Sequence, residues 1–255
     1  MQLESSTVLI TGGATGIGFA LASRFVAKGA RVIVCGRRES ALGRARQEVP
    51  ALEWIVADVG READRVALAE HVVREFPRLN VIVNNAGIQR RHRLAEDVAP
   101  WPERQAEIAV NFEAPVHLTS LLLPYLVQQA NPAVVNVSSG LAFIPAAFAP
   151  VYSATKAALH SFTVSLRHEV SRRGVEVIEI IPPAVDTDLG GPGHHAGAVP
   201  VAEFADAVMA GIAAGKMEIA YGLGEKARTA SRDEIDVMSA RMANPTPGAK
   251  TASAP

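Results

Sequence analysis

The stretch Thr7-Val-Leu-Ile-Thr-Gly-Gly-Ala-Thr-Gly-Ile-Gly18 decides the fold class of this chain. Its first five residues are a short apolar and β-branched run, which predicts a strand. Glycines follow at positions 12, 13, 16 and 18, and a helical pattern begins at about residue 17. A strand, a glycine turn and a helix together can hold a phosphate, because backbone N–H groups and the helix N-terminus face it. The spacing differs from the usual Gly-x-Gly-x-x-Gly, so a tight turn without a ligand is the alternative interpretation.

The alternation of strand and helix continues outward from this stretch. The patterns predict strands over residues 7–11, 31–35, 53–57, 80–83, 134–137, 175–181 and 218–221. They predict helices over 17–28, 39–48, 62–75, 102–129, 151–173, 201–214 and 231–243, with a proline kink in the fourth. This order predicts an α/β fold: a Rossmann-like, doubly wound parallel sheet of about seven strands, in a three-layer α/β/α arrangement. We expect one catalytic and dinucleotide-binding domain over 1–222, a helical extension over 223–243 and a disordered tail over 244–255.

Composition narrows the function. The chain has 255 residues, of which 49% are hydrophobic, and a formal net charge of −1. A near-neutral chain gives no support for nucleic-acid binding. Cys35 is the single cysteine, so an internal disulfide or a cysteine-based metal site is excluded and a reducing compartment fits. The sequence shows neither a signal pattern nor an apolar run of about 20 residues, so we expect a cytoplasmic protein without a membrane span.

A second stretch, residues 139–156, carries candidate chemistry. Tyr152 and Lys156 are four residues apart in a predicted helix and therefore project from the same face. A lysine ammonium beside a phenol favours the phenolate, so we expect a lowered tyrosine pKa and proton transfer near neutral pH. Ser139, at the end of a strand, could hydrogen-bond the same substrate oxygen. By spacing alone, an ordinary pair on a helix surface is the more common interpretation.

The end of the second strand bears on the cofactor. An acidic residue there would bind the 2′-hydroxyl of NAD, but this chain has Gly36, Arg37 and Arg38. Arginine can pair with a 2′-phosphate, which favours NADP. The alternative is that both arginines begin a solvated helix.

Three loops offer further candidates. The segment Asn84-Asn85-Ala86-Gly87 is small enough to let the backbone approach a ligand. The basic segment 89–93 could attract an anionic substrate, although a solvated loop is the more common case. The glycine-rich segment 190–199 contains His194 and His195, but without a third ligand a mobile loop is favoured over a metal site.

Together these motifs resemble the classical short-chain dehydrogenases/reductases over residues 7–221. The resemblance rests on the motif Thr11-Gly12-x-x-x-Gly16-x-Gly18, the segment 84–87 and the residues Asn111, Ser139, Tyr152 and Lys156. The stretches 12–19, 35–38 and 85–91 further resemble the poorly characterised DltE-like group, which brings no known substrate. One departure is Pro182-Pro183, where the family usually has Pro-Gly before the carboxamide contact.

The resemblance implies roles for single residues. Tyr152 would be the general acid/base, Lys156 would hold the nicotinamide ribose, Ser139 would position the substrate oxygen, and Asn111 would anchor a water that relays protons. Asp58 would contact adenine, Asn85 and Gly87 the adenosine side and ribose, and Thr187 the carboxamide. The full implied set of cofactor contacts is Gly12, Thr15, Gly16, Ile17, Gly18, Arg37, Arg38, Asp58, Val59, Asn85, Ala86, Gly87, Tyr152, Lys156, Pro182, Val185 and Thr187.

The sequence therefore predicts an oxidoreductase that interconverts a carbonyl and an alcohol, with NADP(H) preferred and NAD(H) allowed. A catalytically silent sensor of NADP(H) on the same fold is the alternative, and an epimerase or dehydratase is disfavoured because no substrate domain is evident. Segments 141–148 and 189–199 would form mainly apolar pocket walls. Helices 102–129 and 151–173 carry surplus apolar surface, and in the family such helices pair across a two-fold axis, so we expect a homodimer or homotetramer. No metal, nucleic acid or membrane partner is expected.

Overall fold

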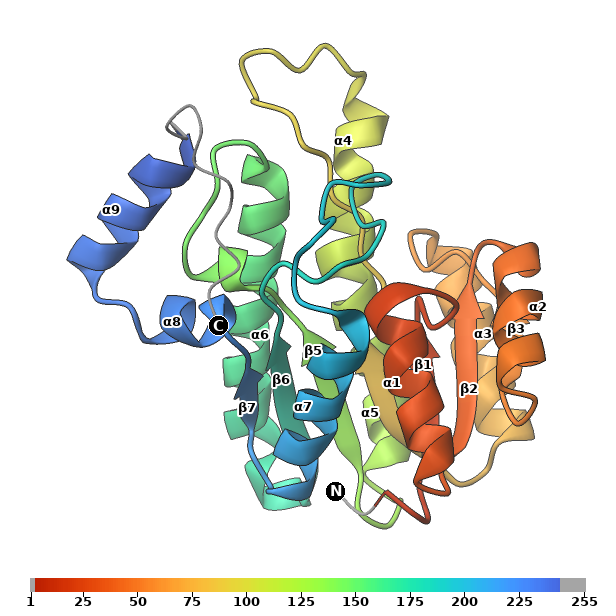
Figure 1. The fold of residues 1–255 in the computed structure, drawn as a ribbon. Coiled ribbons are helices and arrows are strands. Elements are labelled where there is room, and N and C mark those ends of the chain that lie inside the picture. The colour runs from red at the N-terminus through yellow and green to blue at the C-terminus, as the bar shows by residue number, and fades with distance from the viewer. Residues whose placement is uncertain (1–2, 244–255) are drawn as a thin grey trace.

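A parallel sheet forms the centre of the molecule. The computed structural model describes residues 3–243, and seven strands of this part of the chain pair in the order β3-β2-β1-β4-β5-β6-β7 (Figure 1). Their bounds are β1 Thr7–Thr11, β2 Arg31–Gly36, β3 Glu53–Val56, β4 Leu79–Asn84, β5 Ala133–Val137, β6 Glu176–Ile181 and β7 Glu218–Ala220. Every pairing is parallel. The predicted fold class is confirmed.

The strand order places a crevice beside β1. The chain runs from β1 to β2 and β3 on one side, then returns to β4 on the other. Where the strand order reverses, the loops that follow the two adjacent strands run in opposite directions and leave a crevice between them. In such folds, ligands bind in this crevice, beyond the carboxyl ends of the strands. The loops after β1 and β4 are the glycine turn and the segment 85–100, and the start of this segment contacts the glycine turn through Asn85, which donates to Thr11 and Gly12. Figure 1 shows that the rest of the segment rises away from the sheet.

Helices cover both faces of the sheet. They are α1 Gly16–Ala27, α2 Glu39–Glu48, α3 Glu62–Glu75, α4 Trp101–Ile108, α5 Ala114–Leu126, α6 Pro150–Val170, α7 Val201–Ala213, α8 Leu223–Thr229 and α9 Arg232–Ala243. Side chains alternate along β1, so Val8 belongs to the same buried cluster as Phe25 of α1 and Phe204 of α7. Leu9 belongs to a second cluster, with Leu118 of α5, on the other face. A strand covered on both faces must be apolar throughout, which explains the continuous runs in the sequence.

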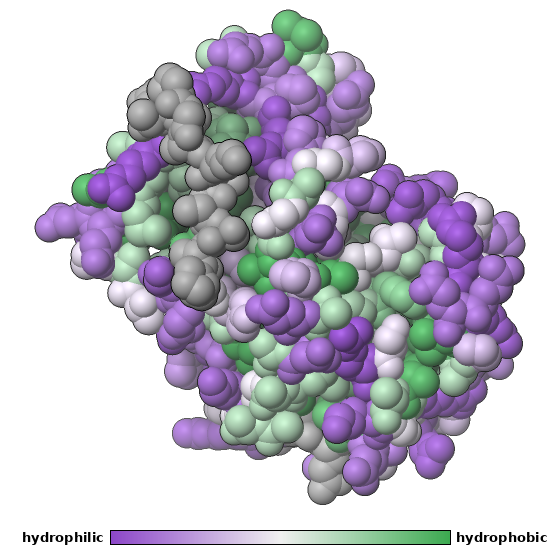
Figure 2. Space-filling view, viewed as in Figure 1, coloured by the Kyte–Doolittle hydropathy of each residue, from purple (hydrophilic) through white to green (hydrophobic). Residues whose placement is uncertain are grey.

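The surface follows from this layering. Figure 2 shows hydrophobic residues gathered over the region of α1 and α7, whereas hydrophilic residues predominate along the outer edge at α2. None of the described helices is long and apolar enough to cross a membrane.

The predicted helix 102–129 is interrupted. It divides into α4, a π-helical turn over Ala109–Glu113, and α5. The irregular turn comes just before Pro115 in the first turn of α5, and Pro124 lies inside α5, so the proline kink stays a prediction. π-Helical turns inside longer helices are frequent at functional sites, and Asn111 lies in this one.

The carboxyl-terminal part contains two helices where the sequence predicted one. The capping box before α9 forms as expected: Ser231 N–H donates to Glu234 (2.8 Å) and Glu234 N–H donates to Ser231 Oγ (3.3 Å). Helix α8 was missed because seven residues are too few for a periodic pattern. The prediction for residues 244–255 lies outside the described residues.

Candidate active site

The turn after β1 requires glycine for two reasons: positive φ angles and close contacts with neighbouring backbone. Gly12 and Gly16 have φ values of +64° and +55°, a region that other residues rarely adopt. A Cβ on Gly18 would lie 2.4 Å from the carbonyl oxygen of Gly12, so the helix can pass beneath the turn only with glycine there. Thr15 precedes α1 in an extended conformation without a side-chain cap, and Ile17 packs on the core in the first helical turn. The helix N-terminus is therefore left open toward the crevice.

The segment after β4 holds this turn in place. The side-chain amide of Asn85 donates to the carbonyl oxygens of Thr11 (2.9 Å) and Gly12 (3.2 Å). The Oγ1 of Thr11 in turn accepts the backbone N–H groups of Asn85 and Ala86, each at 3.0 Å. Asn85 thus uses both amide hydrogens to fix the glycine turn.

At the ends of β2 and β3 lie the residues predicted to meet the adenosine. Arg37 is exposed, and its guanidinium lies 3.9 Å from the carboxylate of Asp58. Asp58 Oδ1 accepts the N–H of Gly60 (3.0 Å), while neighbouring Val59 is buried. Arg38 is exposed and precedes the first turn of α2. The two arginines therefore lie at the edge of the crevice with their charges in solvent.

Tyr152, Lys156 and Ser139 meet at the carboxyl end of β5. Pro150 starts α6, as predicted, and Tyr152 and Lys156 lie in its first two turns with 5% and 3% of their surface exposed. Lys156 Nζ donates to the carbonyl oxygen of Val137 (2.8 Å) and lies 5.7 Å from the centre of the Tyr152 ring. Ser139 lies beside the Tyr152 side chain, whose pKa it lowers, and its Oγ accepts the N–H of Leu141 (3.1 Å).

Asn111 is joined to this group through two elements. It is fully buried: its Oδ1 accepts Ile88 N–H (2.9 Å), and its amide donates to Ile88 O (2.9 Å) and to Thr155 Oγ1 (3.2 Å). A Cβ on Gly87 would lie 3.5 Å from Asn111 Oδ1 and 3.6 Å from Lys156 Nζ. Gly87 therefore lies between the side chains of Asn111 and Lys156, which a larger residue would crowd. The structure thus brings the four predicted catalytic residues close together.

The pKa values differ from the sequence-based expectation. Burial raises the pKa of Tyr152 to about 12, opposed by the hydrogen bond to Ser139 and reinforced by the charge of Glu107. Burial likewise lowers the pKa of Lys156 to about 8. The expected lowering of the tyrosine pKa by Lys156 was wrong for this state, because desolvation disfavours both charged forms. Tyr152 is therefore a neutral phenol near pH 7, able to donate a proton.

The segment after β6 closes the other side of the crevice. Pro182 O accepts the N–H of Gly140 (2.9 Å), and Val185 is buried and forms a bridge to Val199. Thr187 faces the glycine turn, since a Cβ on Gly16 would lie 3.3 Å from its methyl carbon. Because residue 16 is glycine, a narrow space stays open between the glycine turn and the Thr187 side chain. A dinucleotide fits such a set of groups: an open helix N-terminus, a glycine turn, and polar ends of three further strands.

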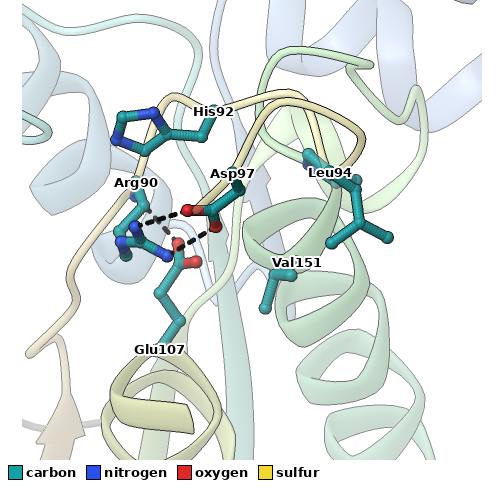
Figure 3. Close-up of a pocket in the computed structure, with 7 residues that line it drawn as sticks. Arg90, His92, Leu94, Asp97, Glu107 and Val151 are labelled. Carbon is teal, nitrogen blue, oxygen red and sulfur yellow. Dashed lines mark hydrogen bonds and ion pairs between the residues drawn. The ribbon is translucent and has the colours of Figure 1, made fainter. Parts of the chain in front are cut away.

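One buried acid was missed by the sequence analysis. Glu107 is 2% exposed and accepts the backbone N–H of Arg90 (2.9 Å), and its pKa is raised by burial. The Arg90 side chain forms two hydrogen bonds with Asp97, at 2.9 and 3.1 Å (Figure 3). These contacts hold the segment 85–100 over the first turn of α6. A lone glutamate in a helical pattern carries no signal of burial, so only the tertiary structure could reveal it.

The family follows from comparison with known proteins. Residues 6–195 match the model of the short chain dehydrogenase family. The chain belongs to this family. It is 43% identical over 241 residues to "Uncharacterized oxidoreductase DltE" of Bacillus subtilis, covering 92% of this chain and 96% of that one. It is also 37% identical over 189 residues to the L-fucose dehydrogenase of Bos taurus, covering 74% of this chain and 69% of that one.

Solved structures agree with the family. A short chain dehydrogenase from Burkholderia cenocepacia in complex with NADP superposes with a TM-score of 0.83 at 25% identity, covering 96% of this chain and all of that one. The short-chain dehydrogenase from Sphingobium yanoikuyae in complex with NADPH gives 0.78 at 29% identity, over 97% and 99% of the two chains. The protein is thus an oxidoreductase of the short-chain dehydrogenase family with the fold of nicotinamide-binding relatives.

Proposed function

We propose that this short-chain dehydrogenase interconverts a carbonyl compound and an alcohol with NADP(H), and that Tyr152 is its general acid/base. The observation that carries the proposal is the burial of Tyr152 beside Ser139 and Lys156, at the mouth of a crevice that a glycine turn borders. When bound, the nicotinamide cofactor supplies or accepts the hydride.

The side chains then divide the remaining work. Ser139 and Tyr152 hold the substrate oxygen by hydrogen bonds, and the neutral phenol gives its proton to that oxygen during reduction. Lys156, held by Val137 O, would hold the nicotinamide ribose with its remaining N–H donors and would stabilise the phenolate as it forms. Asn111 would anchor a water that relays protons through Lys156, as the family resemblance implies.

NADP(H) is the proposed cofactor because β2 ends in Gly36 rather than in an acidic residue, and Arg37 and Arg38 come next. Arg37 lies beside Asp58 at the end of β3, where the adenosine ribose of a dinucleotide is expected. Solved relatives contain both NADP(H) and NAD(H), so the proposed preference rests on the arginines after β2. Asp58, Val59, Gly87 and Thr187 are proposed to contact the adenine, ribose and carboxamide, as the family resemblance implies.

Substitution of Tyr152 tests the proposal. Tyr152→Phe keeps the buried ring and removes the proton donor, so we expect kcat for carbonyl reduction to fall by at least ~100-fold. The affinity for NADPH, measured by calorimetry, should stay within a few-fold of the wild-type value. The matched control is Tyr125→Phe, a half-buried tyrosine of α5 away from the crevice, which should leave kcat unchanged.

Two outcomes would contradict the assignment. Near-normal turnover by Tyr152→Phe would remove Tyr152 from the chemistry. Binding of NADPH by the wild-type protein without turnover of any compound in a broad ketone and aldehyde screen would instead favour a nucleotide sensor.

A further inference from the structure

Two polar atoms near the crevice are buried without a hydrogen-bond partner. Gln89, two residues after Gly87, is 8% exposed, and its Oε1 has no partner among residues 3–243. The Nε2 of His195 is likewise buried and unpaired within the described chain. Burial lowers the pKa of His195, and the charge of Arg91 lowers it further. Because buried polar atoms in folded proteins are almost always paired, two orphans near one cleft mark a place for a polar ligand.

Arg91 lies close to both residues, since it approaches the same Gly190 position as Gln89 and its charge acts on His195. Its guanidinium carbon is 4.3 Å from the centre of the Phe148 ring, and its Cδ lies 3.7 Å from the position that a Cβ on Gly190 would occupy. The same Gly190 position is 3.0 Å from Gln89 Oε1. Arg91 therefore spans the three loops that follow β4, β5 and β6.

The charge of Arg91 is not balanced by an acid in the described part of the chain. The nearby arginines are occupied: Arg90 pairs with Asp97, and Arg93 donates to the carbonyl oxygen of Ala243 (2.7 Å). Asp186 acts on His195, but no ion pair joins it to Arg91 within residues 3–243. A guanidinium stacked on a ring keeps its N–H edges free for a second partner.

This cluster borders the proposed reaction centre. Phe148 precedes Tyr152 by four residues, and Gly87, next to Lys156 Nζ, precedes Gln89 by two. A substrate whose oxygen reaches Tyr152 would extend past these loops, because the proposed dinucleotide would occupy the side toward β1 and β2. The rest of such a substrate would lie beneath Arg91.

We propose that the substrate carries an anionic group, a carboxylate or a phosphate, which Arg91 binds, and that hydroxyl groups of the same substrate donate to the unpaired acceptors Gln89 Oε1 and His195 Nε2. The proposal rests on the proposed carbonyl chemistry and names the class of compound on which it acts. It differs from the expectation that segments 141–148 and 189–199 form mainly apolar pocket walls, because a charged group now lies beside them. Arginine suits either anion, because its planar fork can donate two parallel hydrogen bonds.

Binding without turnover tests this proposal. Protein saturated with NADP⁺ has no hydride to transfer, so oxo compounds can be titrated calorimetrically without reaction. The carboxylate series is pyruvate, acetoacetate and levulinate, each against its own methyl ester; the phosphate arm is dihydroxyacetone phosphate against dihydroxyacetone. We expect at least one anion to bind about 10- to 100-fold tighter than its neutral partner, the scale of a charge-assisted hydrogen bond. The series that shows the difference identifies the anion.

Variants assign the effect to Arg91. Arg91→Met keeps the length of the side chain and its contact with Phe148, and should remove the preference for the anion while leaving the neutral compound unchanged. Arg91→Lys should restore part of it. The control Arg93→Met removes a neighbouring charge of the same loop and should keep the preference. Equal affinities for every anion and its neutral partner, or a preference that survives Arg91→Met, would overturn the inference. Loss of turnover by Tyr152→Phe is measured separately, so either proposal can fail alone.

Discussion

Arg37 and Gly36 are the residues on which cofactor choice should depend. Gly36 ends β2, and a Cβ there would meet only Leu42 at 3.9 Å, so a larger side chain fits without strain. Arg37 is exposed beside Asp58. A 2′-phosphate on the solvent side of the Arg37 guanidinium would accept charge-assisted hydrogen bonds from it.

We predict that NADPH binds at least ~10-fold tighter than NADH, the effect of one charge-assisted hydrogen bond. The double variant Gly36→Asp with Arg37→Ser should reverse this order, because the carboxylate repels the phosphate and accepts from the free ribose hydroxyl. Arg44→Ser, which removes an exposed charge from α2, is the matched control. Dissociation constants for both cofactors decide the matter, and equal values in the wild-type protein would mean that the arginines only face water.

At the scale of elements, α6 is joined to β6 by a pair that the proposed chemistry does not use. His160 Nδ1 lies 2.8 Å from Glu179 Oε2, and Glu179 is fully buried on β6. The hydrogen bond to Glu179 is the main cause of a raised His160 pKa. A histidine whose folded pKa exceeds its unfolded value of about 6.5 stabilises the fold most below that value. The contribution is lost as the pH rises through the folded pKa.

This linkage predicts a stability difference that depends on pH. At pH 6, His160→Gln should lower the free energy of unfolding by about 1.5–3 kcal/mol, the range for a hydrogen bond to a charged group. At pH 9 the loss should be clearly smaller, because the wild-type pair has by then given up its proton. Urea denaturation at both pH values measures it, with His168→Gln, an exposed histidine of the same helix, as the control. A loss of equal size at both pH values would contradict the protonated pair.

Elements differ in how far the sequence could predict them. The strands and α1, α2, α3, α6 and α7 follow from apolar periodicity and from local signals such as Pro150 and the glycine turn. The π-helical turn could not be predicted, because tertiary contacts hold it: Asn111 bonds Ile88 and Thr155, and buried Arg65 of α3 reaches Glu113 at 2.5 Å. The same limit applies to the site. Residue types and order predicted Tyr152 and its neighbours as a candidate site, and the structure brings them together. The pKa of Tyr152 could not be predicted, because it depends on a burial that no local pattern encodes.

At the scale of the whole molecule, α4 and α5 present apolar side chains that the described chain leaves partly uncovered. Trp101 and Ile108 of α4 are 62% and 37% exposed, and Leu121 and Leu123 of α5 are only half-buried. Scattered exposed apolar residues are ordinary, but several along consecutive helices suit a self-association face. We therefore keep the proposal of a homodimer or homotetramer, in which related copies pair through these helices and exclude water from them.

Light scattering on the eluting protein tests this proposal. At micromolar concentration the mass should be two or four times the 26.9 kDa of one chain. Ile108→Lys places a charge on the proposed face, where burial without a partner is costly, so it should shift the mass toward that of a single chain. Val56→Lys, on the edge strand β3 with 51% of the residue exposed, introduces the same charge elsewhere and should keep the assembly. A wild-type mass of one chain would end the proposal. An assembly unaffected by Ile108→Lys would place the contact on another face, most directly the β7 edge, where Met217 is 38% exposed.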